Sequence, residues 1–94
     1  MPKFIIERNI AGASTLSAKE LQEISAKSNA VVAGLGVPYT WLTSYVAGDK
    51  IYCVHEAESA DIIYKHAREG GFPADKVTEV AATFDPTTAE GASG

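Results

Sequence analysis

Six segments of the chain show a regular spacing of apolar and polar residues, and their order predicts an α+β fold. Four short segments rich in aromatic and β-branched residues have the character of strands: 3–8, 39–47, 50–57 and 76–84. Two segments, 17–33 and 59–70, instead repeat apolar residues at every third or fourth position, which is typical of amphipathic helices. The resulting order is βαββαβ, the split βαβ arrangement of ferredoxin-like folds.

The ends of both predicted helices carry recognisable signals. Residues 17–20, Ser-Ala-Lys-Glu, match a capping box, in which Ser17 and Glu20 satisfy each other's free backbone N–H groups. This first helix should end near residue 33, with Gly34 or Gly36 as its C-terminal glycine. Ser59 is the expected cap of the second helix, and the glycine pair 70–71 ends it.

The two central strands should form an antiparallel hairpin, because only residues 48–49, Gly-Asp, separate them. In the second of these strands, alternation places Ile51, Cys53 and His55 on one face and the residues between them on the other. In the first strand the same alternation groups Trp41 with Tyr45. The sequence leaves open which face of each strand meets the helices.

Two right-handed crossovers would put both helices on one face of a four-stranded antiparallel sheet. The other face would then be uncovered, and a contiguous apolar patch usually marks an interaction surface. A homodimer that packs sheet to sheet is the simplest solution. We expect a single ferredoxin-like domain over residues 1–88 and a flexible C-terminal tail over 89–94, which contains only small residues and one glutamate.

Charge and composition exclude several classes of partner. The 94 residues include 8 basic and 12 acidic ones, with a net charge of -4, and the basic residues are scattered singly. Nucleic acids and anionic membranes both call for a concentrated basic surface, so neither is expected as a partner. The single cysteine fits a reducing compartment, and no apolar stretch approaches the ~20 residues of a membrane span. These features predict a cytoplasmic protein.

A metal site is one interpretation of the two histidines. His66 lies near the end of the second predicted helix, and His55 ends the strand before that helix, so the two could meet in space. Together with Glu56 they would provide two imidazoles and a carboxylate, which suits nickel, zinc or iron. Neighbours on a strand point to opposite faces, however, so His55 and Glu56 share a site only with a bulge or a second subunit. Separate structural histidines are the alternative.

A small-molecule pocket is the other candidate site. Aromatic side chains on strands line either a ligand pocket or a core or interface. Cys53 is either a small buried hydrophobe or, with His55 two residues away, a reactive thiol. The candidate pocket residues are Trp41, Tyr45, Tyr52, Cys53 and Tyr64.

Several segments together resemble a family of bacterial domains. These are residues 1–8, the stretch from Trp41 to Val46, residues 50–54, and the His-Ala to Phe-Pro-Ala stretch over 66–74. They resemble the nickel-binding protein-like domains, designated DUF4242, over roughly residues 1–88. The resemblance implies a ferredoxin-like subunit of a dimeric α/β barrel, and at least one relative that binds nickel. For this chain, nickel or another transition metal is therefore the expected cofactor, if it has one. It points to His66 as the residue that would take part in the family's metal or pocket site. His55, in contrast, stands where relatives are expected to have a tyrosine or an apolar residue.

Two functions follow from the sequence and the resemblance, and a purely structural or interaction domain is the third alternative. The first is a homodimer that binds a transition metal or a small ligand, with His66 near the site. The second is a cofactor-free enzyme of the dimeric α/β-barrel type, an oxygenase or isomerase, that acts on a small organic molecule with His66 as general acid or base.

Overall fold

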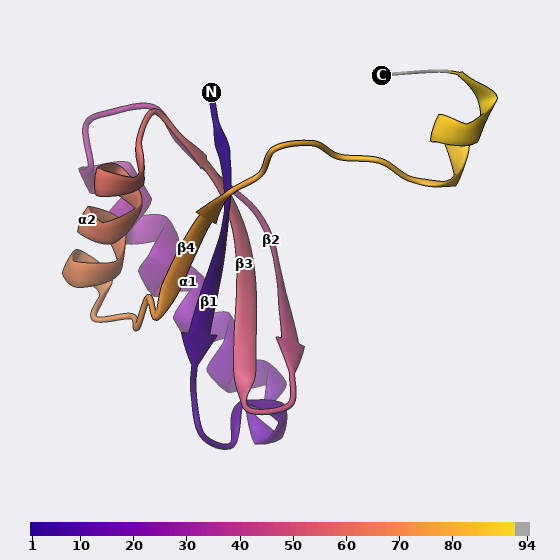
Figure 1. Cartoon of the computed structure of the whole chain (residues 1–94). Helices are drawn as coiled ribbons and strands as arrows, with labels where there is room; N and C mark the ends of the chain where they lie inside the picture. Colours follow the sequence, from indigo (N-terminus) through magenta and orange to yellow (C-terminus); the bar gives the residue numbers. More distant parts are fainter. Residues whose placement is uncertain (92–94) are drawn as a thin grey trace.

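The computed structural model describes residues 1–91. Its helices and strands follow the predicted order: β1 Lys3–Asn9, α1 Ala18–Gly34, β2 Tyr39–Ala47, β3 Lys50–Ala57, α2 Ala60–Gly70 and β4 Lys76–Glu79. Two short 3₁₀ helices, η1 Ala13–Thr15 and η2 Pro86–Glu90, are added to them. The sheet is antiparallel with strand order β2-β3-β1-β4, and both helices lie on one face of it (Figure 1). The predicted ferredoxin-like α+β fold is confirmed.

The capping signals of the sequence work as expected for α1 and only in part for α2. The Glu20 amide donates to Ser17 Oγ at 3.1 Å and the Ser17 amide donates to Glu20 Oε1 at 3.0 Å, which is the predicted capping box. Ser59 takes the cap position of α2, but its side chain makes no capping hydrogen bond. Gly71 ends α2 in the left-handed conformation, with φ of 69°, which a glycine adopts without a steric penalty.

A bulge in β2 overturns the predicted alternation of this strand. Trp41 pairs with His55 of β3, but Thr43, two residues later, pairs with Val54, so Leu42 is an extra residue. Trp41 therefore shares the helix-covered face with His55, and Tyr45 lies on the opposite face. The prediction that Trp41 and Tyr45 share a face was wrong, because strict alternation does not survive an inserted residue.

The buried face of the sheet comes from alternate residues of β1 and β3. In β1 these are Phe4, Ile6 and Arg8, and in β3 they include Cys53 and His55, all of them buried. Ile6 pairs with Cys53 at the centre of this face. The core under the helices therefore contains an arginine and a histidine among its apolar side chains.

The last strand is shorter than predicted. β4 covers Lys76–Glu79 rather than 76–84, and the chain then leaves the sheet and carries η2 away from the body of the domain (Figure 1). Phe84 in this segment is 83% exposed. Of the predicted tail, residues 89 and 90 belong to η2, and 92–94 lie outside the described residues.

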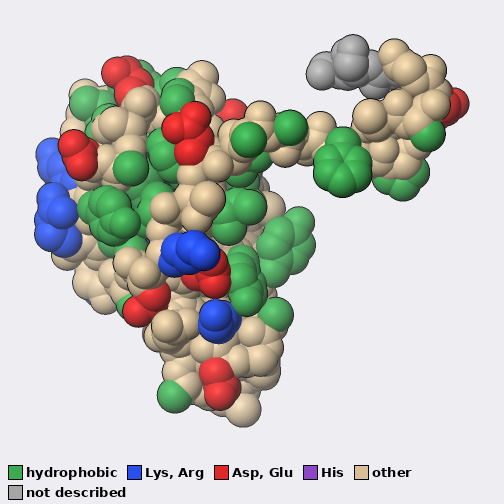
Figure 2. All heavy atoms as spheres, viewed as in Figure 1, with side chains coloured by type: hydrophobic (Ala, Val, Ile, Leu, Met, Phe, Trp, Pro, Cys, Tyr) green, Lys and Arg blue, Asp and Glu red, His purple; other side chains and the backbone are tan. Residues whose placement is uncertain are grey.

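Within the described residues, no helix covers the second face of the sheet. Ile5 and Tyr45 on this face are 40% and 61% exposed. In Figure 2, which shows the molecule from the side of the uncovered strands, hydrophobic side chains lie between charged ones across this surface. Within residues 1–91, no helix is both long enough and apolar enough to span a membrane.

Candidate functional site: a pocket between α1 and the sheet

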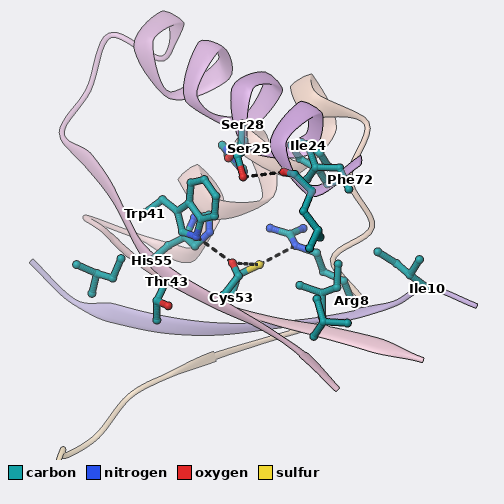
Figure 3. A pocket seen from close by; sticks show the side chains of 16 residues that line it. Arg8, Ile10, Ile24, Ser25, Ser28, Trp41, Thr43, Cys53, His55 and Phe72 are labelled. Atoms are coloured by element: carbon teal, nitrogen blue, oxygen red, sulfur yellow. Dashed lines mark hydrogen bonds between the residues drawn. The ribbon is translucent and has the colours of Figure 1, made fainter. Parts of the chain in front are cut away.

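A pocket of about 410 Å³ lies between α1 and the buried face of the sheet. Its walls are largely apolar, and they include Leu21 and Ile24 of α1, Trp41 of β2, and Phe72 from the turn after α2. Side chains from the sheet point up toward the helix, and Phe72 lies beside them under α1 (Figure 3). The pocket is therefore built from segments that are distant in the sequence, because β1, α1, β2, β3, α2 and the turn after α2 all contribute to its lining.

A chain of hydrogen bonds crosses the sheet side of the pocket. Trp41 Nε1 donates to Ser44 Oγ at 2.9 Å, and Ser44 Oγ donates to Cys53 Sγ at 2.9 Å. Arg8 Nε donates to the same sulfur at 3.4 Å, so three strands are linked through one thiol (Figure 3). The bulge in β2 makes this possible, because it puts Trp41 and Ser44 on the same face.

Arg8 is a buried cation. Its side chain is 4% exposed, Nη1 donates to the Pro73 carbonyl, and the guanidinium lies 5.6 Å from the centre of the Phe72 ring. The ion pairs among residues 1–91 join Lys50 to Glu7 and Lys65 to Glu69, so neither involves Arg8. Burying a charge without an opposite charge costs roughly several kcal/mol. The sulfur, the carbonyl and the aromatic ring offset only part of that cost.

Two buried histidines lie beside Arg8. The rings of His55 and His66 are each 1% exposed, and their centres are 5.2 Å apart. The Tyr39 hydroxyl is 2.5 Å from His55 Nδ1, and Ser28 Oγ is 3.0 Å from His66 Nε2. The Tyr39 ring also stacks on His66 at 5.1 Å. His66 Nδ1 is buried without a partner among the described residues.

Burial keeps both imidazoles neutral. It lowers the pKa of His55 to about 3, helped by nearby His66 and by the Arg8 charge. Burial also lowers the pKa of His66 to about 4, again helped by Arg8 and partly opposed by the backbone of Ser28 and the charge of Glu69. At neutral pH the rings can accept hydrogen bonds or coordinate a metal, because each keeps one unprotonated nitrogen.

The structure gathers four of the predicted site residues in this pocket: Trp41, Cys53, His55 and His66. The predicted three-ligand metal set is not assembled in one chain. Glu56 pairs with Thr40 on the uncovered side of the sheet, so it points away from His55. The described part of the chain contains no group of three or more His, Cys, Asp or Glu side chains that could hold a metal ion.

Three predicted pocket tyrosines lie elsewhere. Tyr45 and Tyr52 form a cross-strand pair on the uncovered face. Tyr64 is 39% exposed on α2. None of the three lines the pocket. The aromatic content of the strands signalled a pocket, but only the position of the bulge decides which rings face it.

Sequence reasoning missed Arg8, Ser44 and Phe72. A signal for Arg8 was present, because a period of two that buries Phe4 and Ile6 also points Arg8 inward. Ser44 could not be placed without the bulge. Phe72 follows a glycine pair, and a side chain on Gly70 would come within 2.3 Å of the Phe72 ring, so the close approach of this ring depends on that glycine.

Fold and site together define a class: a small ferredoxin-like α+β domain with a polar cluster enclosed between one helix and the sheet. Residues 4–80 match the model of a family described as nickel responsive protein SCO4226-like. Because this match covers most of the chain, the protein belongs to the SCO4226-like family. The resemblance to nickel-binding protein-like domains is consistent with this family, whereas the DUF4242 label itself is not tested.

A solved structure supports the fold. The chain is similar to the crystal structure of SCO4226 from Streptomyces coelicolor A3(2), with a TM-score of 0.72 and 20% sequence identity. The alignment covers 87% of this chain and 99% of that one. No curated protein matches the sequence. At this identity the likeness establishes a shared backbone arrangement. The chemistry of the pocket has to be inferred from the residues of this chain.

The neutral histidines predict a loss of stability in mild acid. In the unfolded chain a histidine takes up a proton near its ordinary pKa of 6.5, whereas folded His55 and His66 do so only near 3 and 4. The unfolded state therefore binds more protons as the pH falls below 6.5, and the free energy of unfolding decreases. Between pH 7 and pH 5 each histidine should cost on the order of 2 kcal/mol.

Urea denaturation at pH 7 and pH 5 measures this loss. The His66→Gln variant should lose about half as much stability over the same interval, because one of the two titrating rings is gone. An equal loss in both proteins would contradict a neutral buried His66.

Proposed function

We propose that this protein is a small-ligand binding protein of the SCO4226-like family, and that its ligand occupies the pocket between α1 and the sheet. The observation that carries the proposal is the pocket itself. Its volume of about 410 Å³ falls within the range of roughly 300–1,000 Å³ that is usual for small-molecule sites. Such sites combine apolar walls with a few polar groups that fix orientation.

The polar groups of this pocket converge from three strands. Arg8, Ser44 and Cys53 are joined by hydrogen bonds, and the neutral His55 lies next to them. These groups can orient a ligand, and the apolar side chains of α1 can cover it. The comparisons lend no support to the alternative of a cofactor-free oxygenase or isomerase, so binding is the function proposed.

Nickel or another transition metal is the second candidate ligand. The observation that favours it is His66 Nδ1, a buried nitrogen without a partner in residues 1–91, beside a second neutral imidazole. His55 and His66 would be the nitrogen ligands, which suits nickel. They fit only part of a coordination shell, because residues 1–91 of one chain bring no third such ligand to them and the Arg8 charge lies nearby. Water or a bound organic ligand would complete the shell.

A homodimer is the third part of the proposal. Ile5, Tyr45, Tyr52 and Val54 occupy the sheet face that no helix covers. Packing this face against the same face of a second copy would remove these side chains from water, and a two-fold axis makes such a contact self-complementary. The proposed dimer leaves α1 and its pocket on the outside of each subunit.

A probe-binding experiment tests the pocket. Benzamide, benzoate and indole at millimolar concentration should shift the amide resonances of α1 and β3, and should change the fluorescence of Trp41, the only tryptophan. Ser25→Phe should abolish both effects, because Ser25 lines the pocket and its hydroxyl bonds only to its own helix. Ala26→Phe, on the exposed side of α1, is the matched control and should bind like wild type. Binding of none of the three probes would argue against a ligand pocket.

Calorimetry tests the metal. If the histidine pair holds nickel, wild-type protein should bind Ni²⁺ at micromolar concentration, and His66→Ala should weaken binding about tenfold or more. Zn²⁺ and Co²⁺ serve as comparison metals. Equal Ni²⁺ affinity in wild type and His66→Ala would place any metal elsewhere.

Sedimentation equilibrium tests the dimer. Wild type should sediment as a dimer, and Tyr45→Glu should shift it toward monomer, because the proposed contact would bury a carboxylate without a partner. Tyr64→Glu, an exposed tyrosine on α2, is the control and should remain dimeric. A monomeric wild type would refute the sheet-to-sheet arrangement.

A further inference from the structure

We propose that Arg8 makes one end of the pocket a carboxylate subsite, so that the ligand is a small organic acid with an apolar or aromatic body. This inference rests on the proposed binding function and specifies its chemistry. It begins from a cation that the fold buries without neutralising.

The guanidinium has unused donors. Arg8 makes two hydrogen bonds within residues 1–91, from Nε to Cys53 Sγ and from Nη1 to the Pro73 carbonyl, although the group carries more N–H donors than that. The one fully buried side-chain nitrogen or oxygen without a partner in this part of the chain is His66 Nδ1. Arg8 Nη2, which has no partner either, is therefore not enclosed by protein, and Arg8 lines the pocket.

Within residues 1–91 no carboxylate forms an ion pair with Arg8. The carboxylate of Asp75 lies at the end of β1, where it accepts a hydrogen bond from the Asn9 amide at 2.6 Å. The pocket lining includes no Asp or Glu, and its two imidazoles are kept neutral by burial. The neighbouring acids of the sheet, Glu7 on β1 and Glu56 on β3, alternate onto the uncovered face. A chain with a net charge of -4 thus holds an isolated positive charge inside its pocket. An anionic ligand would supply the missing counter-charge.

The charge of the donor group favours a carboxylate. Nη2 is the nitrogen of Arg8 left to bind a ligand, because Nε and Nη1 already donate to Cys53 and Pro73. Charge-assisted hydrogen bonds from a guanidinium to a carboxylate are stronger than neutral ones. A phosphate monoester carries more charge and a third acceptor oxygen, and this pocket offers a single arginine and no lysine. One carboxylate is the anion that one arginine neutralises.

The rest of the pocket fits an apolar body. Leu21 and Ile24 form the helix side, and the rings of Trp41 and Phe72 lie at the walls. Phe72 already lies against Arg8, so a ligand with its carboxylate on the guanidinium would place its apolar part between this ring and Trp41. Aromatic and branched aliphatic acids have this combination of head group and body.

A matched pair of probes tests the subsite. Benzoate and benzamide have nearly the same shape and differ in charge, and NMR titration of the ¹⁵N-labelled full chain gives a dissociation constant for each. Wild-type protein should bind benzoate about tenfold or more tightly than benzamide. Arg8→Gln should remove the preference, so that the ratio of benzoate to benzamide affinity falls to about one. Arg68→Gln, which removes an exposed arginine of α2, is the charge-matched control and should keep the full preference.

The outcomes separate the two proposals. Equal affinity for benzoate and benzamide in wild type would overturn the carboxylate subsite and leave the pocket standing. Failure of benzoate, benzamide and indole alike to shift the resonances of α1 and β3 would overturn the pocket and the subsite together, whereas binding of indole alone would overturn only the subsite. If Arg8→Gln does not fold, as judged by circular dichroism, the preference of wild type for benzoate over benzamide tests the subsite. Arg8→Lys, which keeps the charge but loses the planar guanidinium, should then retain only part of that preference.

Discussion

The direction in which alternate residues of β1 and β3 point determines most of what this domain can do. Because successive side chains on a strand face opposite ways, the same alternation that buries Phe4 and Ile6 also buries Arg8, and the alternation that buries Ile51 also buries Cys53 and His55. α1 and α2 then cover these polar groups along with the apolar ones. The core therefore contains an apolar cluster around Phe4, Ile6 and Ile51 and, beside it, the polar groups of Arg8, Cys53 and His55.

That polar cluster is poorly explained by stability alone. An apolar residue in place of Arg8 would avoid the cost of burying a charge, and a pair of buried neutral histidines pays a penalty whenever the surroundings become acidic. Groups of this kind tend to be retained at functional sites, where burial and neighbouring charges shift their properties. The hydrogen bonds from Arg8 and Ser44 to Cys53 orient these side chains toward the same space under α1. A binding site accounts for this arrangement better than a structural core does.

The fold could be predicted almost entirely from local signals. The capping box at Ser17, the glycine at 71 and the short Gly-Asp turn of the hairpin are interactions between residues close in sequence, so a reader of the sequence can recognise them. The site could be predicted only in part. Cys53 and His55 were grouped correctly because their strand is regular, whereas Trp41 was assigned with Tyr45 because nothing local announces the bulge at Leu42.

The sequence by itself determined the order of the elements, the ends of the helices and which residues of β1 and of β3 share a face, since each depends on spacing within one segment. Only the tertiary structure decided that no carboxylate of residues 1–91 forms an ion pair with Arg8, that His66 from α2 meets His55 from β3, and that Trp41 turns toward them. The physical reason is that these facts depend on strand register and on how helices pack over the sheet. A shift of one residue in register exchanges the two faces of a strand, and with them the side chains that the pocket receives.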